Sequence, residues 1–160
     1  MNIEIERKFL VRSDSYKQQA EKRTLYRQGY LKSKGKSLVR VRIAGKKAYI
    51  TIKSESKSIS RIEFEYEIPL IDANFMLQSL CEGYIIEKYR YIIPASNALF
   101  WEVDEFIGNN EGLVIAEIEL KTDNDIFDKP DWLGKEVSVD SRYYNSYLSE
   151  KPYNEWEKII

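Results

Sequence analysis

Pairs of like-charged side chains recur at alternate positions along the chain. Glu4 and Glu6 form one pair and Arg40 and Arg42 another, and four more follow: Glu63/Glu65, Lys88/Arg90, Glu102/Asp104 and Glu117/Glu119. In an extended strand, residues i and i+2 share a face, so each pair places two equal charges side by side. Such neighbours repel unless an opposite charge lies between them. Carboxylate pairs suit hard divalent cations, and paired Lys and Arg side chains suit phosphate oxygens.

Two interpretations of these charge stripes are open. Each stripe can be the solvated face of an antiparallel sheet whose other face is buried. Alternatively, the charged faces point into a closed barrel, because eight strands enclose room for side chains or one small ligand. A solvated face usually mixes signs and uses Thr, Ser and Gln freely, so the doubled like charges favour the barrel. The apolar stripes would then face outward and need helices to cover them.

The composition restricts the chemistry that such a barrel could perform. The 160 residues include no histidine and one cysteine, Cys81. Imidazole acid–base catalysis, His-ligated zinc and Ser–His or Cys–His nucleophile pairs are therefore excluded, as is an internal disulfide. An enzyme of this composition has to use carboxylates, Lys, Arg, Tyr and a metal taken from solution.

The overall charge and the termini restrict the partners. The net charge is −1 although 32% of the residues are charged, which argues against non-specific binding to nucleic acids or membranes. The N-terminus has no apolar h-region, and no later apolar run approaches the roughly 20 residues of a membrane span. We expect a cytoplasmic protein that acts on a small molecule, as a monomer or a homodimer.

Period-two alternation dominates the sequence and predicts eight strands. We expect them at 2–11, 25–32, 37–44, 47–54, 60–68, 84–93, 99–107 and 113–121. Capping residues and apolar spacing predict a few helices, at 14–23, 72–81 (with Gly83 as its stop), 130–133 and 141–148. The expected fold class is therefore α+β: one domain over residues 1–160, an eight-stranded antiparallel β-barrel with helices packed outside.

The charged strands also carry motifs that occur together in a fixed order. They are EIERKFLV at 4–11, QGYL at 28–31, VRVR at 39–42, TIK at 51–53, EFEYEIP at 63–69, EKYRY at 87–91, WEVDEF at 101–106, AEIEL at 116–120 and DWLGKEVS at 131–138. A lone ExExK motif has little specificity, but the ordered set spans nearly the whole chain. The set resembles the CYTH family of triphosphate tunnel metalloenzymes.

The resemblance implies a tunnel, open at both ends, whose lining binds a triphosphate and one or two divalent metals. By position, it implies metal ligands at Glu4, Glu6, Asp104, Glu117 and Glu119. It implies phosphate-binding residues at Lys8, Arg40, Arg42, Lys53, Lys88 and Arg90. Carboxylate ligands suit Mg²⁺ or Mn²⁺.

The resemblance also implies catalytic roles for Tyr30, Lys53 and Glu63. Tyr30 and Lys53 resemble a pair that accompanies preference for tripolyphosphate in one bacterial branch. Glu63, with Glu65 as the second candidate, could orient the attacking water. Arg142, in the RYYNSYL segment, resembles part of the family's C-terminal helix.

The expected function is metal-dependent hydrolysis of a triphosphate, with inorganic tripolyphosphate giving pyrophosphate and phosphate. Phosphoryl transfer needs mainly positioning and charge stabilisation, so a site without a covalent nucleophile suffices. Other members of the family provide alternatives: class IV adenylate cyclase, thiamine triphosphatase and nucleoside triphosphatase. A non-catalytic polyphosphate-binding module is the alternative from a different functional class.

Overall fold

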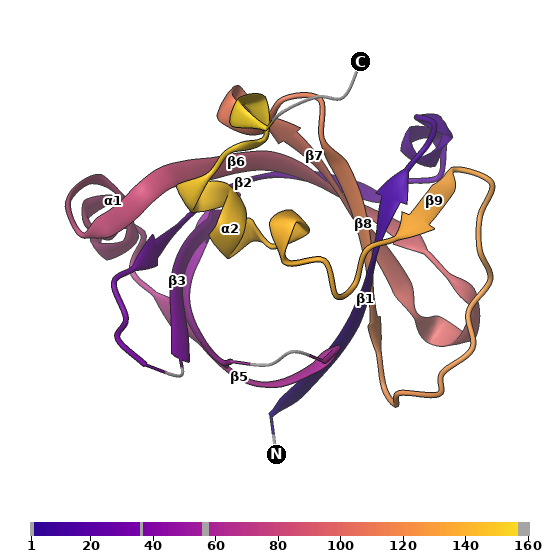
Figure 1. Cartoon of the computed structure of the whole chain (residues 1–160), viewed down its shortest axis with the longest axis horizontal. Coiled ribbons are helices and arrows are strands. Elements are labelled where there is room, and N and C mark those ends of the chain that lie inside the picture. The colour runs from indigo at the N-terminus through magenta and orange to yellow at the C-terminus, as the bar shows by residue number, and fades with distance from the viewer. Residues whose placement is uncertain (1, 36, 56–57, 157–160) are drawn as a thin grey trace.

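Eight antiparallel strands close into a barrel in the computed structural model, which describes residues 2–35, 37–55 and 58–156 (Figure 1). The strands are β1 (Ile3–Val11), β2 (Lys22–Leu31), β3 (Ser37–Ala44), β4 (Lys47–Ser54), β5 (Ser60–Ile68), β6 (Cys81–Pro94), β7 (Phe100–Ile107) and β8 (Val114–Leu120). Their order is β5-β4-β3-β2-β6-β7-β8-β1, and pairing of β5 with β1 closes the ring. The predicted α+β barrel is confirmed.

The remaining elements lie outside the ring or at its end. Strand β9 (Leu133–Glu136) pairs with β1. The two α-helices are α1 (Leu70–Ser79) and α2 (Asn145–Glu150), and the 3₁₀ turns are η1 (Ser15–Gln18), η2 (Ser96–Ala98), η3 (Gly108–Asn110), η4 (Ser141–Tyr143) and η5 (Tyr153–Glu155). In the described ranges, no helix is both long and apolar enough to cross a membrane.

The strand predictions hold to within three residues at each end, whereas the helix predictions hold less well. The helix expected at 14–23 is only the turn η1, because Lys22 and Arg23 already pair with β6. The helix expected at 130–133 is wrong, since Leu133 begins β9 and pairs with Val11. The helix expected at 72–81 runs instead over Leu70–Ser79, and the one at 141–148 splits into η4 and α2.

The hydrophobic core lies mainly outside the barrel, as the inward-charge interpretation requires. Helix α1 buries Ala73 and Leu77 against Val41, Ile43 and Ala48 of β3 and β4. A larger cluster covers β1, β6, β7 and β8 and includes Trp101, Trp132 and Phe127. The two indole rings meet edge to face at 5.5 Å, a favoured aromatic geometry. The main cover is thus the segment around Phe127–Leu133 rather than a helix.

Helix α2 covers part of one barrel opening, where the inner face of the strands becomes apolar (Figure 1). Its buried Leu148 packs with Ile86, Phe106 and Ile115, whose side chains face inward from β6, β7 and β8. This contact fixes the first turn of α2 over the charged interior.

Gly83 does not stop a helix, as the sequence suggested, but lies inside β6. Its φ is +73°, and an added Cβ would lie 2.4 Å from the backbone oxygen of Ser149 in α2. The register between β2 and β6 shifts opposite this point, between Gln28 and Tyr30. Glycine is required here by both the left-handed backbone and the close approach of α2.

Substituting Gly83 by alanine should therefore destabilise the chain more than the backbone angle alone explains. Gly108 is a matched control, because its φ is +67° and an added Cβ would meet nothing within 4 Å. We expect Gly108→Ala to lower the free energy of unfolding by about 1 kcal/mol. Gly83→Ala should lower the free energy of unfolding by about 1–3 kcal/mol more than Gly108→Ala does, because of the clash with Ser149. Denaturant titration of both variants checks this, and equal losses would show that α2 does not pack against Gly83.

Candidate active site

The barrel encloses two cavities that share part of their walls. The shared residues carry both signs of charge: Glu4, Glu6, Arg40, Arg42, Lys53, Arg90 and Glu117. The smaller one, here called the α2-side cavity, measures about 70 Å³ and is bounded by Tyr144, Asn145 and Ser146. The larger one, the wide cavity, measures about 700 Å³. Together they form the charged barrel interior that the alternation predicts, which is here called the tunnel.

Charge is distributed unevenly between the cavities. The α2-side cavity adds the cations Lys8, Arg61 and Lys88 to the shared wall. The wide cavity adds four carboxylates and three lysines: Glu63, Glu65, Glu102, Glu119, Lys22, Lys46 and Lys47. Cations thus predominate beside α2 and carboxylates gather towards the wide cavity. The excess of cations favours an anion in the α2-side cavity, whereas in the wide cavity seven carboxylates balance seven cations.

Two arginines of β3 are held by hydrogen bonds that use only part of their N–H donors. The buried Arg40 donates from Nη2 to Thr51 at 3.1 Å, and its Nε is buried without a hydrogen-bond partner in the described part of the chain. Arg42 donates from Nε to Gln28 at 2.8 Å. Burial, together with the neighbouring Arg40 and Arg90, lowers the pKa of Arg42 to about 10. An unpaired buried donor and crowded like charges both favour binding of an anion.

Lys88 and Arg90 of β6 are positioned by Asp104 of β7. Asp104 is fully buried, and its two oxygens accept from Lys88 Nζ at 2.7 Å and from Arg90 Nε and Nη2 at 2.7 and 2.8 Å. Burial lowers the pKa of Lys88 to about 7, although the Asp104 charge opposes this shift. Asp104 lines neither cavity. It therefore orients two cations and borders neither cavity itself.

Carboxylate side chains of β1 lie beside carboxylates of the two strands that pair with it, β5 and β8. Glu6 hydrogen-bonds Glu117, and Glu4 hydrogen-bonds Glu63. Burial and the adjacent Glu117 and Glu4 charges raise the pKa of Glu6 to about 8. Burial would also raise the pKa of Glu117, but Lys8, 3.1 Å away, and other nearby cations hold it well below its ordinary value. Such carboxylate pairs retain a proton unless a cation replaces it.

The ligand type of these carboxylate groups suits a hard divalent cation. Carboxylate oxygens are the ligands such ions prefer, and burial and the neighbouring carboxylates raise the pKa of Glu6 although Lys8 and Lys53 oppose the shift. In the described residues no three acidic groups meet as a ready metal-binding cluster. Lys53 instead binds Glu4, with Nζ at 2.9 Å from Oε1.

Known proteins similar to this chain identify its family. The model of the CYTH domain matches residues 2–150. The chain belongs to the CYTH family. An inorganic triphosphatase from Acetivibrio thermocellus is 52% identical over 158 residues, which cover 99% of this chain and all of the relative. One from Nitrosomonas europaea is 35% identical over 91% of this chain and 96% of its own length.

A solved structure shares the architecture. The crystal structure of an inorganic triphosphatase, 32% identical in sequence, superposes with a TM-score of 0.66 over 91% of this chain and 93% of its own. The CYTH resemblance inferred from the ordered motifs is thereby confirmed.

Most of the residues that the CYTH resemblance implicates line the tunnel. Ten of them bound the α2-side cavity: Glu4, Glu6, Lys8, Tyr30, Arg40, Arg42, Lys53, Lys88, Arg90 and Glu117. Glu63 and Glu119 bound the wide cavity. Asp104 is buried and bounds neither cavity, and Arg142 is exposed and paired with Asp140 at 2.6 Å.

The predicted pairing of Tyr30 with Lys53 takes a different form. Both side chains line the α2-side cavity. The Tyr30 hydroxyl, however, accepts from Gln28 Nε2 at 3.4 Å, and Lys53 binds Glu4. The two residues therefore face the same space without contacting each other.

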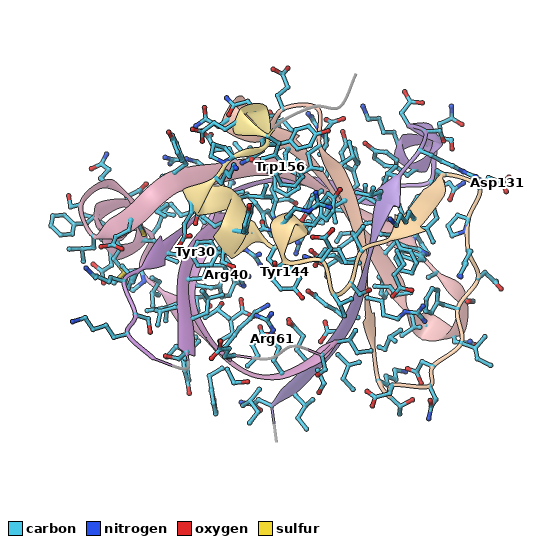
Figure 2. All side chains as sticks on the ribbon, in the orientation of Figure 1. Tyr30, Arg40, Arg61, Asp131, Tyr144 and Trp156 are labelled. Atoms are coloured by element: carbon cyan, nitrogen blue, oxygen red, sulfur yellow. The ribbon has the colours of Figure 1, made fainter. Side chains whose placement is uncertain are left out.

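The sequence reasoning missed several tunnel residues. Arg61 lines the α2-side cavity and shares the inner face of β5 with Glu63, so alternation could have identified it. Its guanidinium lies 5.6 Å from the ring of Tyr144, and Lys8 Nζ lies 5.3 Å from the same ring. Figure 2 shows Arg61 and Tyr144 inside the ring of strands. Tyr144 directly precedes the short helix α2, and Asn145 is its first residue. No strand alternation therefore indicates which of their side chains points inward.

Proposed function

We propose that this CYTH protein hydrolyses inorganic tripolyphosphate to pyrophosphate and phosphate with a divalent cation, within a single domain. The observation that carries the proposal is the cluster of buried cations beside α2, in which the Nε of Arg40 is left without a partner in the described chain. The relatives named inorganic triphosphatase, one of them 52% identical over 99% of this chain, support it.

The cations would hold the phosphate chain from several strands at once. Arg40 and Arg42 approach from β3, Lys88 and Arg90 from β6, and Lys8 from β1. Guanidinium groups bind phosphate oxygens in bidentate fashion. Because these donors surround a narrow space, they favour a linear run of phosphates held in line for attack.

Four carboxylates would hold Mg²⁺ or Mn²⁺: Glu4, Glu6, Glu117 and Glu119. When bound, such a cation supplies positive charge against phosphate oxygens and favours loss of a proton from water. Asp104 has both oxygens occupied by Lys88 and Arg90, so we assign it to positioning these two cations rather than to the metal.

Glu63 would orient the attacking water. It lines the wide cavity, hydrogen-bonds Glu4 and lies 4.0 Å from Lys53 Nζ. In this position Glu63 would lie on the carboxylate side of a bound phosphate chain. A carboxylate so placed can accept a proton from water without forming a covalent intermediate.

Tyr30 should contribute to preference for tripolyphosphate. Its hydroxyl accepts from Gln28, which leaves its own proton free to donate into the α2-side cavity. We expect wild-type protein to turn over tripolyphosphate with kcat/KM at least roughly tenfold above that for ATP. Tyr30→Phe should narrow this ratio without unfolding the chain.

Tyr66 provides the matched control for this test, because it lies on the outer face of β5 and is exposed. Tyr66→Phe should leave the ratio of the two kcat/KM values unchanged. A ratio that Tyr30→Phe does not alter would remove the hydroxyl from substrate selection.

A further inference from the structure

The amide of Asn145, the first residue of α2, connects this helix to the cations of the tunnel. Its Oδ1 accepts from Gln28 Nε2 at 2.9 Å and from Lys88 Nζ at 2.8 Å. Asn145 also lines the α2-side cavity. Packing of Leu148 among Ile86, Phe106 and Ile115 holds the helix at this position. Sequence reasoning gave Asn145 no role.

The orientation of the Asn145 amide is fixed by donor-only groups at both ends of a short chain of hydrogen bonds. An ammonium has no acceptor, so Lys88 requires the oxygen of Asn145 to face it. The Arg42 guanidinium likewise requires the oxygen of Gln28, which lies 2.8 Å from its Nε. The amide nitrogen of Gln28 must then face Asn145, where it again meets Oδ1.

This arrangement leaves Nδ2 as the polar group that Asn145 can offer to the cavity. In the described residues Nδ2 has no hydrogen-bond partner, and it is not among the buried unpaired atoms. The cavity that Asn145 lines carries seven cations, among them Arg40, Arg42 and Arg90, and three carboxylates. An N–H donor in a cavity where cations predominate is complementary to the oxygens of a phosphate held there.

We propose that Asn145 binds the phosphate chain directly, with Nδ2 donating to a phosphate oxygen in the α2-side cavity. Helix α2 is then part of the substrate site as well as a cover for the barrel. The identity of the ligand rests on the proposed function, whereas the direction of the hydrogen bond rests on the amide geometry.

Two substitutions at this position separate contact with phosphate from support of Lys88. Asn145→Ala removes both the donor and the acceptor. Asn145→Asp keeps an acceptor oxygen for Lys88 and Gln28 but replaces the N–H donors by a second oxygen. The affinity for tripolyphosphate is measured by calorimetry on chelator-treated protein, with thermal unfolding as a check of the fold. Asn74→Asp adds the same charge on the exposed surface of α1 and serves as control.

A direct contact predicts that both variants bind more weakly than wild type, by on the order of tenfold or more, with Asn145→Asp at least as weak as Asn145→Ala. Asn74→Asp should bind as wild type does. Three results would overturn the proposal: wild-type affinity in Asn145→Ala, recovery of affinity in Asn145→Asp, or no binding of tripolyphosphate by the wild-type chain. A wild type that binds tripolyphosphate but releases no phosphate contradicts only the proposed function.

Discussion

Replacing Glu117 with glutamine should lower kcat/KM for tripolyphosphate by at least roughly 10²-fold, a loss comparable to removal of a transition-state electrostatic partner. Glu117 is buried, binds Lys8 at 3.1 Å and hydrogen-bonds Glu6. Glutamine keeps the size of the side chain and removes the charge that both the divalent cation and Lys8 require. Glu4→Gln should act similarly, because Glu4 binds Lys53 and hydrogen-bonds Glu63.

The control for these variants is Glu111→Gln, since Glu111 is exposed and lines neither cavity. It should retain wild-type kinetics. Initial rates of phosphate release over a range of tripolyphosphate concentrations give kcat and KM for all variants. A loss smaller than about threefold at Glu117 or Glu4 would remove that residue from the site.

Chelation of divalent cations should abolish turnover, and addition of Mg²⁺ or Mn²⁺ should restore it. The tunnel carboxylates lack histidine and paired cysteine as companions, so a bound ion would be held by oxygen ligands and exchange with solution. Burial and the adjacent carboxylates raise the pKa of Glu6 to about 8, and a cation bound beside them favours the charged carboxylates. Binding to the folded state alone should therefore also raise the unfolding temperature.

The unfolding temperature, measured without substrate, separates binding of the cation to the protein from an effect of the cation on the substrate. Mn²⁺ added without tripolyphosphate should stabilise the wild type and stabilise Glu117→Gln less. Undiminished phosphate release in excess chelator would refute the metal requirement. Equal stabilisation of both proteins would place the cation elsewhere.

Alternation predicted the barrel and most of the tunnel lining because a strand side chain can point to one of only two faces. Once Glu4, Arg40 and Glu117 are placed inside, every second residue of their strands follows. Arg61 was accessible to the same argument, since it precedes Glu63 by two residues. The prediction failed where this period is absent or interrupted, as at Gly83, where β6 shifts its register against β2.

Tertiary contacts explain the remaining differences. Asp104 shares its strand face with Glu102 but lies next to Ile115 of β8 rather than a carboxylate, and it is occupied by Lys88 and Arg90. Leu133 forms a strand because β1 offers it a partner, which no local pattern at 130–133 reveals. Asn145 acquires its position from the packing of Leu148, a contact between segments far apart in the sequence.

The most direct test of the central claim is product analysis with wild-type protein given tripolyphosphate or ATP in the presence of Mg²⁺ or Mn²⁺. The account predicts release of phosphate and pyrophosphate from tripolyphosphate, with kcat/KM at least roughly tenfold above that for ATP. Cyclic AMP and pyrophosphate from ATP, as the better substrate, would mean that a ribose hydroxyl replaces water as the nucleophile. That result, or binding of tripolyphosphate without turnover, would contradict the assignment as a tripolyphosphatase.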